Sequence, residues 1–247
     1  MRLTARTVLN PDAAATDTEA VELSARLLDA LRAGPKEERA AGDLAAQLHG
    51  VHPIEIEGDD ARIAFWLNLY NALLLNRLLV RPVTGKMTMH PRVFSSSVYV
   101  IGGATYSLNQ IEHGVLRRNS RAPYTGRRTF RSNDPRLRVA PSRIDPRIHF
   151  ALNCGARSCP PIRTYAADRL GADLEAAATA YLTVETEIGP DAITLPRLMR
   201  LYRGDFGSTA DQIRFAADRL PALRDLDSGD PRLLEPRYGR FDWSADT

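Results

Sequence analysis

Lysine is scarce in this sequence: Lys36 and Lys86 are the only two among 33 basic residues, and arginine makes up the rest. This bias is typical of a GC-rich genome. The formal net charge is only +3, and ten of the arginines lie between residues 117 and 147. Surfaces that bind single-stranded nucleic acid interleave aromatic and basic side chains, and this stretch has few aromatics. We therefore do not expect a nucleic-acid-binding protein.

Cysteine is scarce too, since the chain has only Cys154 and Cys159. Two cysteines are too few for a disulfide-stabilised scaffold, although one bridge across that short loop is geometrically feasible. The N-terminal residues lack a continuous apolar stretch followed by a cleavage signature. We therefore expect no secretory signal and a cytoplasmic location.

An uninterrupted hydrophobic run is also missing. The most apolar segment, residues 61–80, has a length close to that of a membrane span, but Asn68, Asn71, Asn76 and Arg77 interrupt it. Each of these polar groups would need a partner in hydrocarbon, so the segment predicts a buried core helix and no membrane span. Asn68 and Asn71 share one helix face, and buried amides must be hydrogen-bonded, which predicts that they hold a neighbouring loop.

The remaining pattern predicts an α+β fold, with the central buried helix packed on a small antiparallel sheet and peripheral helices around it. Helical spacing covers residues 17–33, capped by Thr16 or Asp17, and a second helix covers 36–49. Residues 97–106 read as a hairpin that turns at Gly102-Gly103. Ser107 and Gln110 have the spacing of a capping box for the next helix.

Further along the chain, residues 117–147 hold four prolines and little periodicity, which predicts a long surface loop. The apolar stretch 148–154 predicts a buried strand that ends at a proline-stopped turn. Helices and one short strand follow. We assign Asp205-Phe206-Gly207 to the end of a helix that stops at Gly207.

Four blocks of sequence resemble the DUF547 family: FWLNLYNALLL (65–75), YSLNQIEHGVLRRN (106–119), DPRIHFALNCGARSCPPIRTY (145–165) and LYRGDFG (201–207). The closing FDWS resembles the end of the family pattern. The resemblance implies an N-terminal helical extension over residues 1–50 and a DUF547-like domain over 51–247, together forming one compact unit. It implies no activity, because the family is one of unknown function with members in bacteria and plants.

Reactive side chains concentrate between His149 and Cys159, with Glu112-His113 elsewhere in the chain. Cys154 precedes a glycine at the end of the expected strand, where its thiolate would be stabilised by a histidine or an arginine. The sequence therefore predicts catalytic roles for Cys154, His113, His149 and Glu112 in amide or ester hydrolysis or acyl transfer.

Candidate substrate-binding residues are Asn68, Asn71, Asn153 and Arg157, because amide and guanidinium groups can donate hydrogen bonds to a developing oxyanion. We expect a small-molecule or peptide substrate and no cofactor. In a regular strand, His149 and Cys154 would point to opposite faces, which favours His113 as the partner of the thiol.

Other interpretations of the cysteines remain open. Two thiolates and a histidine suit zinc, but the C-x4-C spacing is not that of a zinc knuckle, so we assign no metal site. The cysteines are also compatible with a disulfide or with simple core packing. A helix followed by a hairpin resembles papain-like or transglutaminase-like proteins by analogy alone. The rival function is a non-catalytic interaction domain that binds a protein or phosphate-bearing partner through the arginine-rich loop.

Overall fold

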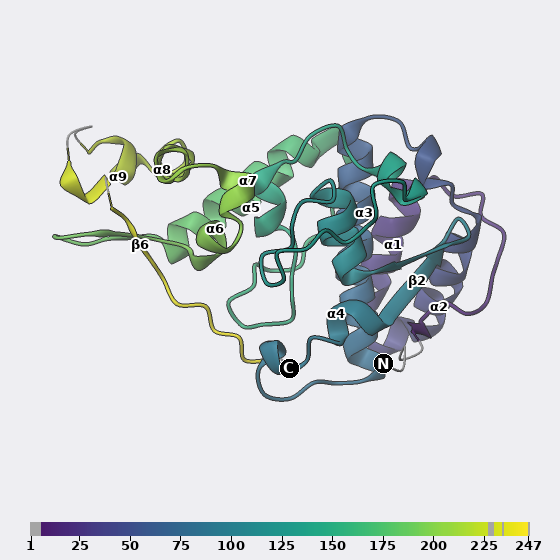
Figure 1. The fold of residues 1–247 in the computed structure, drawn as a ribbon. Helices are drawn as coiled ribbons and strands as arrows, with labels where there is room; N and C mark the ends of the chain where they lie inside the picture. Colours follow the sequence, from purple (N-terminus) through teal and green to yellow (C-terminus); the bar gives the residue numbers. More distant parts are fainter. Residues whose placement is uncertain (1–5, 227–229, 234, 247) are drawn as a thin grey trace.

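The computed structural model describes residues 6–226, 230–233 and 235–246, and it has the α+β architecture that the sequence predicts (Figure 1). Its centre is helix α3 (Asp59–Val80), in which every residue from Ile63 to Leu74 is buried. Helix α1 (Ala20–Ala33) packs along it through leucines such as Leu23 and Leu27. The expected caps Thr16 and Asp17 are wrong: the Glu19 carboxylate accepts the first free N–H groups of α1.

Helix α2 (Glu38–Gln47) lies between two 3-10 turns, Pro35–Glu37 and Leu48–Gly50, in agreement with the expected span. Its buried residues belong to the same core as α1 and α3. The N-terminal helices therefore share the core with the segment that resembles the family.

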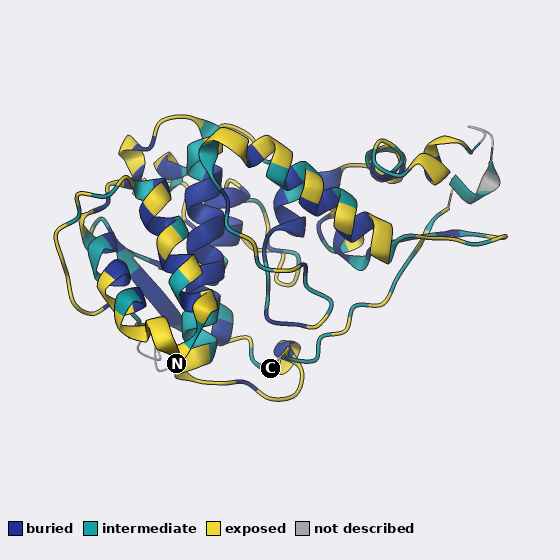
Figure 2. Ribbon diagram, turned by 180° about the vertical axis from the view of Figure 1, so that it is seen from behind, coloured by how far each residue is buried: buried dark blue, intermediate teal, exposed yellow. Residues whose placement is uncertain are grey.

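Helix α3 is the one helix of the described residues that is long and apolar enough to cross a membrane. In its most apolar window 67% of the residues are buried inside the protein, which is the property of a core helix. Figure 2 shows α3 as the most continuously buried helix of the molecule.

A three-stranded sheet covers part of the core. Strand β2 (Ser97–Ile101) pairs antiparallel with β3 (Ala104–Ser107), which confirms the expected hairpin. Strand β1 (Thr7–Val8) adds to β2 in parallel, so the sheet is mixed and not antiparallel throughout as expected. The turn requires Gly102, because its φ is +54° and a Cβ atom there would lie 2.4 Å from the Val51 carbonyl oxygen. The short helix α4 (Val93–Ser96) leads into β2.

The next helix begins with the predicted capping box. The Gln110 side chain accepts the Ser107 N–H, and the Ser107 hydroxyl accepts the Gln110 N–H. The helix is a π-helix over Gln110–Leu116, and all seven of its residues are buried. Glu112 and His113 of this π-helix line the cavity described below, and π-helical turns are frequent at functional sites.

The expected buried strand over residues 148–154 is wrong. Asp145 caps a 3-10 turn over Pro146–Phe150, and residues 151–154 continue without regular structure. An apolar run has no period that separates a strand from a buried turn, and Pro146 behind a capping Asp favours the turn. The argument that His149 and Cys154 occupy opposite faces therefore does not apply.

A second region with its own apolar core follows α5 (Leu170–Glu185). Its sheet contains β4 (Glu187–Ile188), β5 (Ile193–Leu195) and β6 (Arg237–Tyr238) in that order. Its short helices are α6 (Arg197–Leu201), α7 (Arg203–Phe206), α8 (Thr209–Ala217) and α9 (Pro221–Arg224). This region projects to one side in Figure 1, and the C-terminal segment then runs back to the main body. Gly207 ends α7 with φ +85°, as expected.

The other short turns are 3-10 helices. They span Pro53–Glu55, Met87–Met89, Pro135–Val139, Ala167–Arg169 and Pro231–Leu233.

Candidate active site

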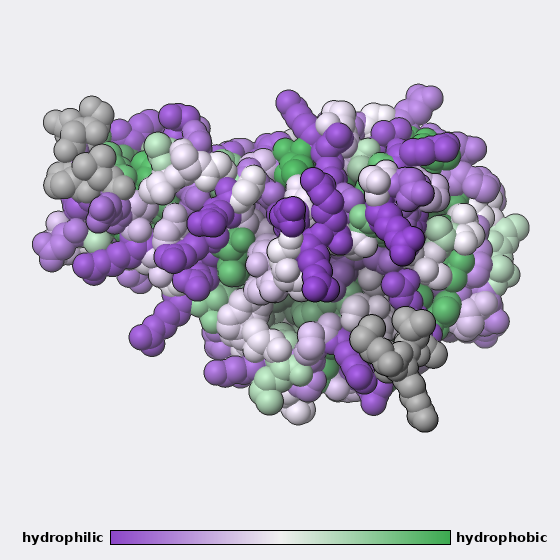
Figure 3. Space-filling model, in the orientation of Figure 1, coloured by the Kyte–Doolittle hydropathy of each residue, from purple (hydrophilic) through white to green (hydrophobic). Residues whose placement is uncertain are grey.

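A cavity of about 540 Å³ opens between four parts of the chain. They are the π-helix, the loop of residues 151–160 that carries both cysteines (the cysteine loop), residues 117–147 (the arginine-rich loop) and residues 239–246 (the C-terminal segment). Its walls are largely aromatic and aliphatic, and its polar groups include Glu112, His113, His149, Cys154 and Cys159. Figure 3 shows a hollow near the middle of one face, with hydrophilic side chains above it and residues of intermediate to hydrophobic character below it. The four side chains that the sequence predicts as catalytic therefore line one cavity.

Glu112 is buried at this cavity and is held by two tyrosines. The Tyr202 hydroxyl donates to Oε1 at 2.6 Å, and the Tyr70 hydroxyl donates to Oε2 at 3.2 Å. Burial opposes ionisation of this carboxyl, but His113, the Tyr202 hydrogen bond and Arg117 outweigh burial and lower the pKa of Glu112. The carboxylate is therefore ionised at neutral pH and can only accept hydrogen bonds.

A buried ion pair lies beside Glu112. Arg117 donates from Nε and Nη2 to the two carboxylate oxygens of Asp205, at 2.5 and 2.9 Å. Asp205 Oδ2 also lies 2.8 Å from His149 Nε2. Although burial opposes it, the hydrogen bonds from His149 and Arg117 hold the pKa of Asp205 at about 2.

The Asp205 contact fixes the tautomer of His149. Burial lowers the pKa of His149, so the ring is neutral at pH 7 despite the carboxylate. The ring must donate its Nε2–H to Asp205, and this leaves the lone pair on Nδ1. The described residues supply no hydrogen-bond partner for Nδ1. The ring also stacks on Tyr202, with centroids 3.7 Å apart, so its plane is fixed.

The second imidazole is held in a complementary way. Arg117 Nη1 lies 3.2 Å from His113 Nδ1, and Glu112 Oε1 lies 3.4 Å from the same nitrogen. Burial lowers the pKa of His113 as well, and Arg117 adds to this effect. Because a guanidinium can only donate, it favours the lone pair on Nδ1 and the proton on Nε2. Arg117 thus orients both histidines, one directly and one through Asp205.

Cys154 and Cys159 are free, partly buried thiols with their sulfur atoms 2.7 Å apart. Cys159 Sγ also accepts the backbone N–H of Cys154 at 3.0 Å. Burial opposes ionisation of Cys159, but these hydrogen bonds outweigh it and lower the pKa of Cys159. The pKa of Cys154 is raised, because its thiol faces the sulfur of Cys159 and is buried. Cys159 is therefore the sulfur more readily ionised, whereas the sequence favoured Cys154.

The cysteine loop is fixed at both ends. Asn71 Nδ2 donates to the Ala151 carbonyl at 3.0 Å, and Asn71 Oδ1 accepts the N–H of Asn153 at 3.1 Å. The Asn153 side chain then donates across the loop to the Pro160 carbonyl at 2.9 Å. The predicted role of Asn71 in holding a loop is thus confirmed.

The C-terminal segment runs along the outside of the same loop. The N–H of Arg157 donates to Ser244 O, and the N–H of Asp246 donates to Gly155 O. Trp243 contributes to the cavity wall and meets the ring of Tyr124 edge to face at 6.1 Å. Residues far apart in sequence therefore complete the cavity.

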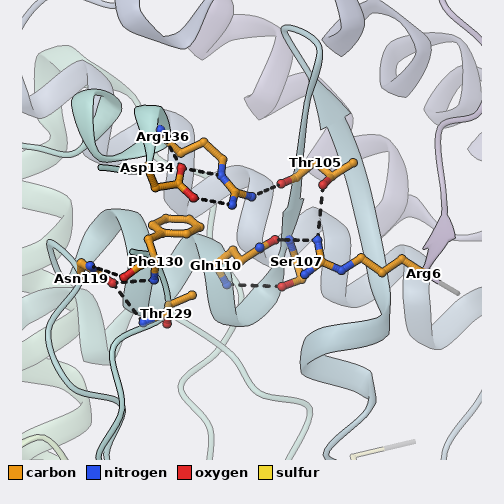
Figure 4. A network of polar contacts seen from close by, with 9 residues as sticks. All are labelled: Arg6, Thr105, Ser107, Gln110, Asn119, Thr129, Phe130, Asp134 and Arg136. Carbon is orange, nitrogen blue, oxygen red and sulfur yellow. Dashed lines mark hydrogen bonds and ion pairs between the residues drawn. The ribbon is translucent and has the colours of Figure 1, made fainter. Parts of the chain in front are cut away.

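The arginine-rich loop is held by its own polar groups (Figure 4). Asn119 accepts the N–H groups of Thr129 and Phe130, and Arg136 pairs with Asp134 while its guanidinium lies 4.3 Å above the Phe130 ring. Six of the ten arginines between residues 117 and 147 donate side-chain hydrogen bonds within the described chain: Arg117, Arg118, Arg121, Arg128, Arg136 and Arg147. Binding of a protein or phosphate-bearing partner by this loop stays a prediction.

A family model described as "Protein of unknown function, DUF547" matches residues 55–182. The chain belongs to this family. No curated protein and no solved structure matches the chain. The DUF547 match includes Glu112, His113, His149 and both cysteines, but it ends before Tyr202 and Asp205. Part of the cavity of this DUF547 protein is thus built from residues outside the matched region.

The predicted substrate-binding residues of this DUF547 protein lie outside the cavity lining. Asn68 and Asn71 are fully buried, and their amides bind loop backbone. Asn153 bridges the cysteine loop, and Arg157 is exposed beside the C-terminal segment. Their substrate-binding role stays a prediction, while their contacts are those of scaffold residues.

Sequence reasoning missed four residues of the site: Tyr70, Arg117, Tyr202 and Asp205. Tyr70 and Asp205 were assigned to the core and to a helix end, and Arg117 to a charged loop. The one signal that could have indicated them is that all four lie inside three of the family-like blocks: Tyr70 in 65–75, Arg117 in 106–119, and Tyr202 and Asp205 in 201–207. Among the described residues, no three His, Cys, Asp or Glu side chains form a group that could hold a metal ion.

Proposed function

We propose that the cavity is the active site of a cysteine-dependent hydrolase or acyl transferase that acts on the amide or ester of a small molecule or peptide. The observation that carries this proposal is the Asp205–His149 pair at the cavity that also holds the two thiols. An ionised aspartate that accepts one ring N–H leaves the other ring nitrogen as a base, which is the division of roles that thiol and serine hydrolases use.

In the proposed reaction, the Cys159 thiolate attacks the carbonyl carbon and the leaving group departs from the tetrahedral intermediate. His149 takes the Cys159 proton at Nδ1 and gives it to the leaving group, which leaves the acyl group on Cys159 as a thioester. Water or an acceptor alcohol or amine then loses a proton to His149 and attacks this thioester, so that the carbon–sulfur bond breaks, the acyl product departs and His149 returns the proton to Cys159 Sγ. Ionised Asp205 stabilises the imidazolium that forms between these steps. Arg117 is a positioning residue, because it acts through Asp205 and His113.

Other residues of the cavity would stabilise the oxyanion and bind the substrate. His113, with its proton on Nε2, is a donor for the negative charge that develops on the carbonyl oxygen. The aromatic walls, which include Tyr124 and Trp243, favour an apolar group next to the reactive carbonyl. Two free thiols also suit the reducing environment of a cytoplasmic location.

The likeness to papain-like proteins supports this chemistry only by analogy. Those proteins place the cysteine at the start of the central helix, where α3 has Asp59 and Asp60. In this chain both thiols lie on the loop that Asn71 of α3 holds.

The test is a single-turnover assay with p-nitrophenyl acetate, followed by intact mass measurement of the protein. We expect a burst of p-nitrophenol and an acetylated protein, both lost in Cys159→Ser and reduced by roughly 100-fold or more in His149→Gln, as for other general bases. His52→Gln is the matched control, because this histidine is exposed and lies outside the cavity lining. Absence of an acyl-enzyme in the wild type across acetyl, butyryl and aryl esters would refute the proposal.

A further inference from the structure

The acyl-transfer proposal uses one sulfur and leaves the second unexplained. A thiol hydrolase needs only one cysteine, yet Cys154 Sγ lies 2.7 Å from Cys159 Sγ, closer than two sulfur atoms normally approach without a bond. Both sulfurs belong to residues that line the cavity, so a small molecule can reach them. The pair therefore has the arrangement of a nucleophilic thiol and a resolving thiol.

The loop keeps this arrangement without a covalent link. The N–H of Cys159 donates to Ala156 O at 2.9 Å, and the Asn153 side chain joins the ends of the loop through Pro160 O. The C-terminal segment adds backbone hydrogen bonds to Gly155 and Arg157 from the outside. Because the two sulfurs are held together in the reduced protein, attack of one on a bond to the other is intramolecular and correspondingly fast.

The environment of the two sulfurs is unequal. Cys159 Sγ accepts the backbone N–H of Cys154 at 3.0 Å, which stabilises a thiolate, whereas Cys154 is hydrogen-bonded to the sulfur of Cys159. Ionised Glu112 also lies on this cavity and opposes a second negative charge. One thiolate and one thiol is therefore the stable state of the pair.

We propose that Cys154 and Cys159 also catalyse thiol–disulfide exchange, with a low-molecular-weight disulfide as the oxidant and Cys159 as the attacking sulfur. This activity goes beyond acyl transfer and does not depend on it. It needs neither His149 nor Asp205, because the attacking sulfur is stabilised by backbone and by its neighbouring thiol.

The exchange proceeds in two balanced steps. The Cys159 thiolate attacks one sulfur of R–S–S–R, so that a mixed disulfide forms and R–S⁻ leaves. Cys154 then loses its proton to solvent or to the departing thiolate and attacks Cys159 Sγ, which forms the Cys154–Cys159 disulfide and releases the second R–S⁻. Two electrons pass from the pair to the substrate disulfide, and an external dithiol returns them.

The test treats the full-length reduced protein with bis(2-hydroxyethyl) disulfide and follows intact mass and released 2-mercaptoethanol. We expect the wild type to lose two hydrogen atoms, to release two thiols per chain and to accumulate no adduct. Cys154→Ser should stop at a stable adduct on Cys159, because the resolving sulfur is missing. Cys159→Ser should react at least roughly tenfold more slowly than Cys154→Ser, since it keeps only the thiol of higher pKa.

Three results would overturn the proposal: a wild type that stays reduced, a wild type that accumulates the mixed disulfide, or a Cys159→Ser variant that forms its adduct as fast as Cys154→Ser does. The wild-type measurements decide the question even if a variant does not fold. Asp205→Asn separates the two activities, because it should abolish acyl transfer and change the exchange rate less than about threefold in a folded protein. In the wild type, absence of ester cleavage with intact exchange would reject the hydrolase alone, and ester cleavage without exchange would reject the exchange alone.

Discussion

Two pairs of buried polar side chains illustrate the difference between scaffold and site. On α3, the amides of Asn68 and Asn71 bind loop backbone through both the oxygen and the nitrogen of each side chain. At the cavity, His113 and His149 each have one ring nitrogen in a hydrogen bond to a charged group, and the described chain supplies no hydrogen-bond partner for the other nitrogen. All four residues are nearly inaccessible, so burial alone does not separate them.

The asparagines differ from the histidines in how many of their side-chain polar atoms have a hydrogen-bond partner. A buried polar group with every atom paired fixes the chain around it, and its removal leaves backbone groups without partners. A buried group with one atom left over retains capacity for a ligand. This comparison predicts that the asparagines affect stability first, and that the histidines affect chemistry first.

The largest expected effect comes from the charged group on which the histidine pair depends. Asp205→Ala leaves the Arg117 guanidinium, 3% exposed, without its counterion, and we expect a loss of about 3–5 kcal/mol in the free energy of unfolding. Urea denaturation measures this loss. The control is Glu22→Ala, which removes an exposed ion pair with Arg26 and should cost less than about 1 kcal/mol. Equal losses in the two variants would show that the buried Arg117–Asp205 pair contributes no more to the free energy of unfolding than an exposed ion pair does.

The next effect sharpens the comparison on the asparagine side. Asn71→Ala and Asn68→Ala each leave one carbonyl and one N–H unpaired in the core, and each should cost about 2–4 kcal/mol. Only Asn71 holds the cysteine loop, whereas Asn68 holds the chain at Tyr165. We therefore expect iodoacetamide labelling of Cys159 to change in Asn71→Ala alone. The same change in both variants would indicate a general loss of packing.

The asparagine side of this comparison is readable from sequence, because it depends on local periodicity. The apolar spacing of residues 61–80 with two amides three residues apart predicts the buried helix and its loop contact. The hairpin and the capping box are predicted for the same reason, since Gly102-Gly103 and Ser107-x-x-Gln110 are local signals.

The histidine side is not readable in this way. Asp205 reaches Arg117 across 88 positions and His149 across 56, and no local pattern records such a pairing. The strand wrongly predicted at 148–154 could have been avoided, because a local sequence pattern precedes it. Asp-Pro-Arg occurs at 134–136, 145–147 and 230–232, and each copy forms the same 3-10 turn with an Asp–Arg ion pair.

A pH titration tests the histidines together. Both rings have pKa values below the unfolded value of about 6.5, because burial opposes their charge. Their contribution to stability is complete above that pH and is lost as the pH falls, since the unfolded chain then binds protons that the folded protein does not. Between pH 6.5 and 5.5 we expect a loss of up to about 2 kcal/mol, because each unfolded histidine goes from half to almost fully protonated and contributes about 1 kcal/mol over this range. His149→Gln should reduce this slope and His52→Gln should not; a flat profile in the wild type would contradict neutral burial.

The smallest expected effect concerns the two tyrosines that hold Glu112. Tyr202→Phe removes the 2.6 Å hydrogen bond to Oε1 and should cost about 1.5 kcal/mol, in the range of hydrogen bonds to charged groups. Tyr70→Phe removes a 3.2 Å bond to the other oxygen and should cost less. The pKa of Glu112 should rise more in Tyr202→Phe than in Tyr70→Phe, because the Tyr202 hydroxyl is the closer donor that keeps this pKa low. A ¹³C NMR titration of the Glu112 carboxyl carbon measures this difference, and the phenylalanine ring at 202 preserves the stack on His149. If the two variants raise the pKa of Glu112 equally, this carboxylate does not distinguish its two donors, and its charge is set by Arg117 and the imidazoles instead.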